Sequence, residues 1–219
     1  MQEQPTNTSG RRILLLIAGI PVTIILAASW LWWFVVQGDL DLVDALGTAN
    51  KGELVTPPRA LAEADLTLSS GSALPWVNSD RQWTLLVANA GTGCATECEY
   101  NLYLTRQIHT AMGKYYPRIR RFYIGDHAVG STPLDVAALS DQNPLPENLE
   151  RLLERDHPGM TALEIAPPAY EALFPETATA PDTWYLVDPA GWIMMSYNVD
   201  DSYKDVISDL KFLLKNSGN

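Results

Sequence analysis

Two cysteines, Cys94 and Cys98, are the residues of this chain whose type and spacing most clearly suggest chemistry. They follow an apolar run at 82–89 that is typical of a buried strand. A thiol at the first turn of a helix lies near unpaired backbone N–H groups and the positive end of the helix dipole, and both favour its thiolate form. The pair therefore suggests either thiol–disulfide exchange or the binding of a soft ion such as Cu(I).

The C-x-x-x-C spacing separates this pair from the C-x-x-C motif of thioredoxin-type oxidoreductases. Cβ atoms four residues apart on a regular helix are about 5–6 Å apart, whereas a disulfide needs about 3.5–4.5 Å. A bond between Cys94 and Cys98 therefore requires Cys94 to lie before the helix. The carboxylates of Glu97 and Glu99 oppose a nearby thiolate, and chance proximity of the two cysteines stays open at this point.

The elements around the pair predict an α/β domain. Apolar residues at Leu102, Leu104, Ile108 and Met112 recur with helical spacing after the first strand. The predicted elements are strand 82–89, helix 97–116, strand 118–124, helix 146–155, a hairpin with strands ending at 187 and 197 around a turn at 188–191, and helix 201–214. This β-α-β-α-β-β-α order is that of a thioredoxin-like domain, with the cysteines at its first strand–helix junction.

An uncharged apolar run near the N-terminus predicts a single membrane anchor. Residues 13–36 carry no charge and, at about 1.5 Å per residue, are long enough to cross a hydrocarbon layer of about 30 Å. Two arginines precede the run, so the positive-inside rule predicts a cytoplasmic tail at 1–12 and a periplasmic remainder. We expect a transmembrane helix at 13–36 of a bacterial inner membrane, an extended membrane-proximal segment at 37–80 and the thioredoxin-like domain at 81–216.

The acidic composition and the predicted extracytoplasmic location limit the functions that this chain can have. The chain has 15 Lys and Arg against 26 Asp and Glu, a formal net charge of -11, which argues against nucleic acid as a partner. An extracytoplasmic space allows disulfides to form and persist. A bridge between Cys94 and Cys98 closes a loop too short to stabilise the fold much, which favours a functional rather than a structural pair.

Three segments carry a recognisable set of motifs: 91–107 with the C-x-x-x-C pair, 123–133 ending in Thr132 and Pro133, and 184–197 with the hairpin turn. Together they resemble the Sco/SenC family of membrane-anchored, thioredoxin-like copper chaperones for cytochrome c oxidase, over about residues 50–215. The resemblance implies a role in oxidase biogenesis, with an oxidase subunit or its assembly factors as partners. It also implies thiol exchange or Cu(I) handling, with Cys94 as the exposed attacking thiolate and Cys98 as the resolving one.

Two positions depart from the family pattern. Glu99 stands where the family motif continues with Pro, and Ala180 stands where the family has the His that completes a copper site with the two thiolates. The predicted metal ligands are therefore Cys94, Cys98 and, as a substitute, His127. His127 follows the second strand, whose end should lie on the same sheet edge as the cysteines. Without the usual His, Cu(I) is the copper ion that two thiolates can hold.

The remaining predictions concern a proline and a histidine. Pro181 lies near the position where thioredoxin-like reductases place a cis-proline facing the cysteines, so it is a candidate catalytic residue. His157 precedes Pro158 in a predicted loop and is expected to be exposed.

Two alternatives to the Sco-like role stay open: a general periplasmic thiol–disulfide oxidoreductase, and a non-catalytic thioredoxin-like interaction protein of the oxidase. Whether the chain is an enzyme stays open with them.

Overall fold

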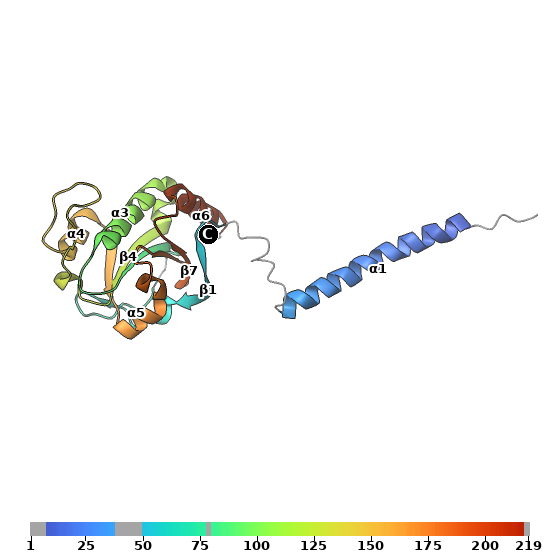
Figure 1. The fold of residues 1–219 in the computed structure, drawn as a ribbon, viewed down its shortest axis with the longest axis horizontal. Helices are drawn as coiled ribbons and strands as arrows, with labels where there is room; N and C mark the ends of the chain where they lie inside the picture. Colours follow the sequence, from blue (N-terminus) through green and yellow to red (C-terminus); the bar gives the residue numbers. More distant parts are fainter. Residues whose placement is uncertain (1–7, 38–49, 78–79, 217–219) are drawn as a thin grey trace, which may run out of the picture. The chain divides into compact units, whose positions relative to one another are not determined.

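The computed structural model describes residues 8–37, 50–77 and 80–216, and the chain divides into two compact units, Met1–Ala49 and Asn50–Asn219. The first unit contains helix α1 (Thr8–Gln37; Figure 1). Apolar side chains of this helix, such as those of Leu15 and Ile24, are more than half exposed. Within the described part of the chain, no helix meets the length and hydropathy expected of a membrane span. The predicted transmembrane crossing at 13–36 is thus not confirmed and stays a prediction.

The second unit is built on one seven-stranded sheet with the order β1-β7-β6-β3-β4-β5-β2. Strands β3, β4 and β5 are parallel to one another, while β6, β7 and β1 add antiparallel strands on one side and β2 adds one on the other. The strands are β1 (Glu53–Ala60), β2 (Thr67–Leu68), β3 (Trp83–Asn89), β4 (Ile119–Gly125), β5 (Met160–Glu164), β6 (Trp184–Val187) and β7 (Trp192–Tyr197).

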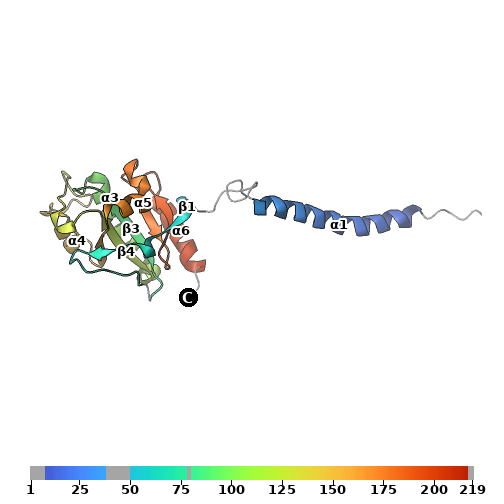
Figure 2. The ribbon, with the colours of Figure 1, turned by 90° about the horizontal axis from the view of Figure 1, so that it is seen from below.

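Helices cover both faces of this sheet (Figures 1 and 2). They are α3 (Thr96–Ala111), α4 (Leu149–Asp156), α5 (Pro167–Leu173) and α6 (Tyr203–Asn216). The side chains of β3 alternate between the faces: Leu85 packs with residues of α3 and α6, whereas Leu86 packs with residues of α5 on the opposite face. Every residue of β3 except Asn89 is buried, as the apolar run predicts for a central strand.

Most helices and strands around the cysteines form where the sequence predicts them. The first two predicted strands correspond to β3 and β4, the predicted hairpin to β6 and β7, and the three predicted helices to α3, α4 and α6. Helix α3 ends at Ala111, before the predicted 116, because residues Gly113–Arg118 form a 3-10 helix. The α/β class and the thioredoxin-like fold are confirmed, but the predicted β-α-β-α-β-β-α order lacked the strand and the helix between α4 and β6.

The sequence analysis missed β1, β2, β5 and α5. β1 carries Pro57 and Pro58, which lack N–H donors and normally argue against a strand; they are tolerated because β1 is the edge strand. β2 has two residues and β5 five, so neither shows a clear alternation. Because β1 and β2 belong to the sheet, residues 50–77 lie within the globular unit Asn50–Asn219. The sequence analysis had predicted them as part of an extended membrane-proximal segment.

Candidate functional site: the Cys94–Cys98 disulfide

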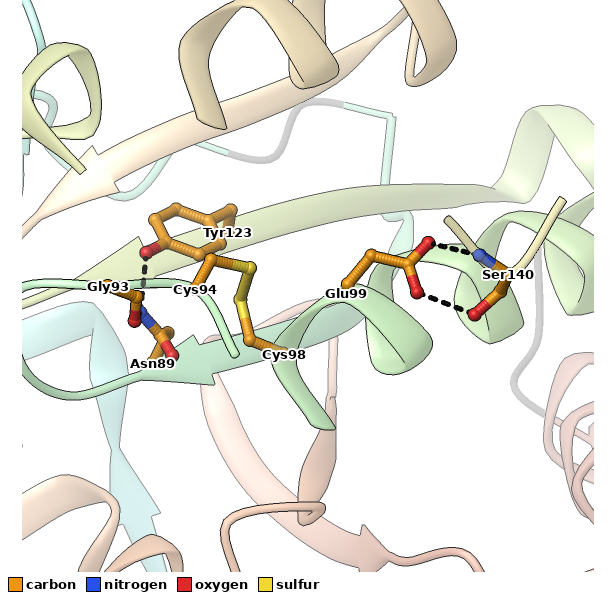
Figure 3. The surroundings of a disulfide bond; sticks show 7 residues. All are labelled: Asn89, Gly93, Cys94, Cys98, Glu99, Tyr123 and Ser140. Carbon is orange, nitrogen blue, oxygen red and sulfur yellow. Dashed lines mark hydrogen bonds between the residues drawn. A yellow bond between two sulfur atoms is a disulfide. The ribbon is translucent and has the colours of Figure 1, made fainter. Parts of the chain in front are cut away.

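The two cysteines form a disulfide at the junction between β3 and α3 (Figure 3). The Cα atoms of Cys94 and Cys98 are 5.3 Å apart, and the sulfur atoms are 2.07 Å apart. The helix begins at Thr96, and Ala95 before it has an extended backbone. Cys94 therefore lies off the helix while Cys98 lies in its first turn, which is the arrangement that the spacing required for a bond.

Both sulfur-bearing residues are buried. Cys94 is 0% exposed and Cys98 is 4% exposed. They belong to an apolar cluster that includes Leu102 from α3, Leu139 from the segment after β4 and Leu149 from α4. The expectation of an exposed Cys94 is therefore wrong for the disulfide form, because a segment that lies 35 or more residues later in the chain covers it.

The covering segment is joined to Cys94 through the backbone. The N–H of Cys94 donates to the carbonyl of Pro133 at 2.9 Å, and the N–H of Asp135 donates to the carbonyl of Cys94 at 2.9 Å. Cys94 and Leu134 thus form an isolated parallel bridge. The side chain of Asp135 lies against Gly93, where a Cβ atom would be 2.0 Å from Oδ2 of Asp135.

Glu99 attaches the same segment from inside α3. Its carboxylate accepts the N–H of Ser140 at 3.0 Å and the hydroxyl of Ser140 at 2.5 Å (Figure 3). Glu99 is only 5% exposed, and the described residues include no cation paired with it. A carboxylate is thus placed one residue from Cys98 and is satisfied by hydrogen bonds rather than by a positive charge.

On the other side of the disulfide, Asn89 connects the end of β3 to its neighbours. Its side-chain amide donates to the carbonyl of Gly93 and to the hydroxyl of Tyr123, both at 3.2 Å. Tyr123 is 1% exposed, and burial raises the pKa of its hydroxyl above the ordinary value. The hydroxyl therefore stays protonated at neutral pH and can donate as well as accept a hydrogen bond.

His127 lies near the loop that leads to Cys94, but it is not part of the buried site. Its Nδ1 atom is 2.8 Å from Oδ1 of Asp126, which also accepts the N–H of Gly91 at 2.8 Å. The imidazole is 44% exposed. Among the residues that the structure describes, no group of three or more His, Cys, Asp or Glu side chains could hold a metal ion.

The disulfide form therefore does not fit a copper ion, because both sulfurs are bonded to each other and His127 is paired with Asp126. A ligand set of Cys94, Cys98 and His127 stays a prediction for a reduced form.

Pro181 lies in the loop that precedes β6 and is exposed. The cis peptide bond found in the described residues precedes Pro57, so the Ala180–Pro181 bond is trans. The side-chain amide of Asn101 in α3 donates to the carbonyl of Asp182 at 3.0 Å, which attaches this loop to the cysteine-bearing helix. A catalytic role for Pro181 stays a prediction.

The expectation of an exposed His157 is wrong. His157 is 4% exposed, and its Nδ1 atom accepts a hydrogen bond from Nη1 of Arg121 at 3.2 Å. The sequence analysis also missed the contact between Glu99 and Ser140, which are 41 residues apart in the chain. The departure from the family pattern at Glu99 marked the position, but no local signal identified its partner.

Comparisons with known proteins agree with this architecture. The sequence matches the family described as "Transmembrane-like, thioredoxin-like, C-terminal domain" over residues 83–217. Apo Sco1 from Thermus thermophilus is 18% identical, with a TM-score of 0.50 over 76% of this chain and 99% of that chain. Yeast Sco1 with copper bound is 14% identical, with a TM-score of 0.49 over 78% of this chain and 96% of that chain.

A third solved structure is that of BsSco, described as a member of the Sco family of cytochrome c oxidase assembly proteins with a disulfide switch. It is 16% identical, with a TM-score of 0.47 over 78% of this chain and 99% of that chain. No curated protein sequence matches.

The likeness to the Thermus protein shows a shared fold, and the matching family describes this fold as thioredoxin-like. The family match covers the strand that precedes the disulfide, the helix that carries Cys98 and the C-terminal helix. This chain belongs to the family of transmembrane-like, thioredoxin-like C-terminal domains.

Proposed function

We propose that this protein is an extracytoplasmic thiol–disulfide factor that serves the assembly of cytochrome c oxidase. The observation that carries the proposal is the Cys94–Cys98 disulfide at the junction between the central strand β3 and helix α3. The helix N-terminus favours the thiolate that such chemistry needs. We infer the client, an oxidase subunit or one of its assembly factors, from the motif resemblance to Sco proteins. BsSco is described as a member of a family of cytochrome c oxidase assembly proteins.

The proposed reaction transfers two electrons from a client dithiol to the disulfide. A client thiolate attacks one sulfur of the pair, the S–S bond breaks, and the other sulfur leaves as a thiolate. The second client thiolate then attacks the mixed disulfide and releases the second cysteine of the pair. The client is oxidised to a disulfide, and Cys94 and Cys98 are reduced to thiols that carry the two protons lost by the client.

The test is to replace the cysteines in a strain that lacks the native gene. We expect Cys94→Ser, Cys98→Ser and the double variant each to lower cytochrome c oxidase activity under copper limitation, while Ser69→Ala, at an exposed position, preserves it. Alkylation of trapped cells should show both oxidised and reduced wild-type protein. Normal oxidase activity with the double variant would overturn the proposal and favour a non-catalytic role.

A second candidate function is the carriage of Cu(I) as cargo by the reduced pair. The observation that favours it is the closeness of the two cysteines, whose Cα atoms are 5.3 Å apart, because two thiolates suffice to hold this soft ion. Anaerobic titration of the reduced full chain should then show about one tightly held Cu(I), lost in Cys94→Ser and Cys98→Ser. Weaker binding in His127→Ala would identify His127 as a ligand, and unchanged binding would exclude it.

We also propose that the protein is anchored in the bacterial inner membrane, with 1–12 cytoplasmic and the globular unit periplasmic. The uncharged run at 13–36 and the arginines before it support this placement, and a periplasmic site would allow the disulfide to persist. The full chain should remain in the membrane fraction after an alkaline carbonate wash. A chain that begins at residue 50 should be soluble. Release of the full chain by the wash would contradict the anchor.

A further inference from the structure

The segment between β4 and α4 covers the disulfide, and we call residues 129–141 the cover segment. On its inner side, Leu139 is 3% exposed and packs in the same apolar cluster as Cys94 and Cys98. Other side chains of the segment, such as that of Asp135, are exposed. The cover segment thus has the sulfurs on one side and solvent on the other.

Two side chains of α3 hold the cover segment in addition to the backbone bridge at Cys94. Glu99 accepts two hydrogen bonds from Ser140. Arg106 donates to Oδ2 of Asp141 at 2.7 Å, in an ion pair. Glu99 and Arg106 are seven residues apart and therefore lie on the same face of the helix.

Of the two side-chain contacts that hold the cover segment, that of Glu99 lies nearer to the cysteines along α3. Its side chain follows Cys98 directly and is buried, and both hydrogen bonds that satisfy it come from Ser140. If the cover segment moves away, the carboxylate must exchange these bonds for water. If Ser140 loses its hydroxyl, one of the two bonds is lost even in the closed arrangement, so the closed arrangement becomes less favourable.

We infer that Glu99 is a positioning residue that holds the cover segment over the disulfide and so limits the access of thiols to Cys94 and Cys98. This inference rests on the proposed thiol–disulfide function. A thiolate must reach a sulfur atom to attack it, and Cys94 is 0% exposed in the closed arrangement. Cys98 is 4% exposed, so little of either cysteine can be reached until the cover segment moves, and the Glu99–Ser140 contact opposes that movement.

The test measures how fast dithiothreitol reduces the oxidised full chain in mild detergent. Dithiothreitol loses two electrons and forms a cyclic disulfide while the protein disulfide becomes two thiols, which are alkylated and counted by intact mass. We expect Ser140→Ala to increase the second-order rate by about tenfold or more. Glu99→Gln keeps an oxygen that accepts the N–H of Ser140 but loses the charge that strengthens both bonds, so it should increase the rate by a smaller factor. Ser140→Thr keeps the hydroxyl and the N–H donor and should stay close to the wild-type rate.

The matched control is Glu97→Gln. Glu97 also lies one residue from Cys98 and in the first turn of α3, but it is exposed. Its substitution removes the same charge without changing a contact to the cover segment. If Glu97→Gln accelerates reduction as much as Glu99→Gln, the effect belongs to charge alone and the inference is overturned.

Stability provides the second readout. In Ser140→Ala, the unfolding free energy of the oxidised protein, measured with urea, should fall by much less than the rise in reduction rate would require if global unfolding exposed the sulfurs. An unchanged rate in Ser140→Ala would overturn the inference. So would a rise in rate that the loss of unfolding free energy fully accounts for, because the sulfurs would then be exposed by global unfolding. The assay uses no client, so failure of the oxidase phenotype would remove the proposed function without changing this result.

Discussion

At the scale of single residues, buried polar groups depend on partners that are distant in the chain. His157, at the end of α4, accepts a hydrogen bond from Arg121 of β4. Burial is the largest cause that lowers the pKa of His157 from its ordinary 6.5 to about 3, and the charges of Arg121 and Arg106 lower it further, while Asp156 and Asp141 oppose them. Burial also lowers the pKa of Arg121 to about 10, which leaves its guanidinium charged at neutral pH.

We predict that His157 makes the domain sensitive to acid. The folded pKa is below the unfolded one, so the unfolded chain takes up a proton first, and stability is lost as the pH falls from about 6.5 toward about 3. The contribution should approach about 1.4 kcal/mol per pH unit. His157→Asn retains an acceptor for Arg121 and should reduce this pH dependence in urea unfolding between pH 6.5 and 4. An unchanged pH dependence in His157→Asn would contradict this prediction.

At the scale of elements, α6 holds the start of the globular unit. Asp209 of α6 is 6% exposed, and its Oδ2 atom accepts the N–H groups of Lys51 and Gly52 at 2.9 and 3.1 Å and the hydroxyl of Tyr197 at 3.2 Å. A side chain at Gly52 would meet the ring of Tyr197, since a Cβ there would lie 2.3 Å from Cε1. The polypeptide therefore enters β1 through a tight contact between β7 and α6.

We predict that Asp209→Ala lowers the unfolding free energy by about 1–3 kcal/mol, because two backbone N–H groups lose their acceptor. The buried hydroxyl of Tyr197 also loses its carboxylate acceptor and keeps only the sulfur of Met195, at 3.6 Å. The control is Asp205→Ala, one turn earlier on the same helix, because the Asp205 carboxylate accepts no such bonds in the described structure. Urea unfolding of both variants checks this. Equal losses for the two would show that the acceptor role of Asp209 contributes little.

At the scale of the whole molecule, the globular unit extends to Asn50 rather than beginning near residue 81. β1 pairs with β7 at one edge of the sheet, β2 pairs with β5 at the other, and the connection between them buries Leu61 and Leu66 in the core. Both outer strands of the sheet therefore come from residues that the sequence analysis placed outside the domain.

We predict that residues 50–219 unfold in one cooperative transition, whereas a chain that begins at residue 81 is strongly destabilised. Removal of the segment exposes the edge of β7 and deletes Val55, Leu61 and Leu66 from the core, each worth about 1.5–3 kcal/mol when fully buried. Circular dichroism during urea unfolding measures this. A similar midpoint for the two chains would contradict the prediction.

Several features could be predicted from the sequence because they depend on neighbouring residues. The apolar run of β3, the helical spacing of Leu102 and Ile108 in α3, and the hairpin turn after Val187 are local patterns, and they placed the cysteines at the first strand–helix junction. The requirement that Cys94 lie before the helix followed from the geometry of a disulfide. The pairing of β1 could not be predicted in the same way, since its prolines are acceptable only at an edge that the whole sheet defines.

The sequence by itself thus determined the α/β class, the central elements other than β5 and α5, and the position of the thiol pair, because the periodicity of apolar residues encodes each of these locally. The tertiary structure decided that Cys94 is buried rather than exposed, that Glu99 binds Ser140 and that His157 is neutral beside Arg121. Each of these results depends on residues about 35 to 41 positions apart that only the folded chain brings together. Access to the disulfide is therefore controlled by long-range packing, not by the C-x-x-x-C motif alone.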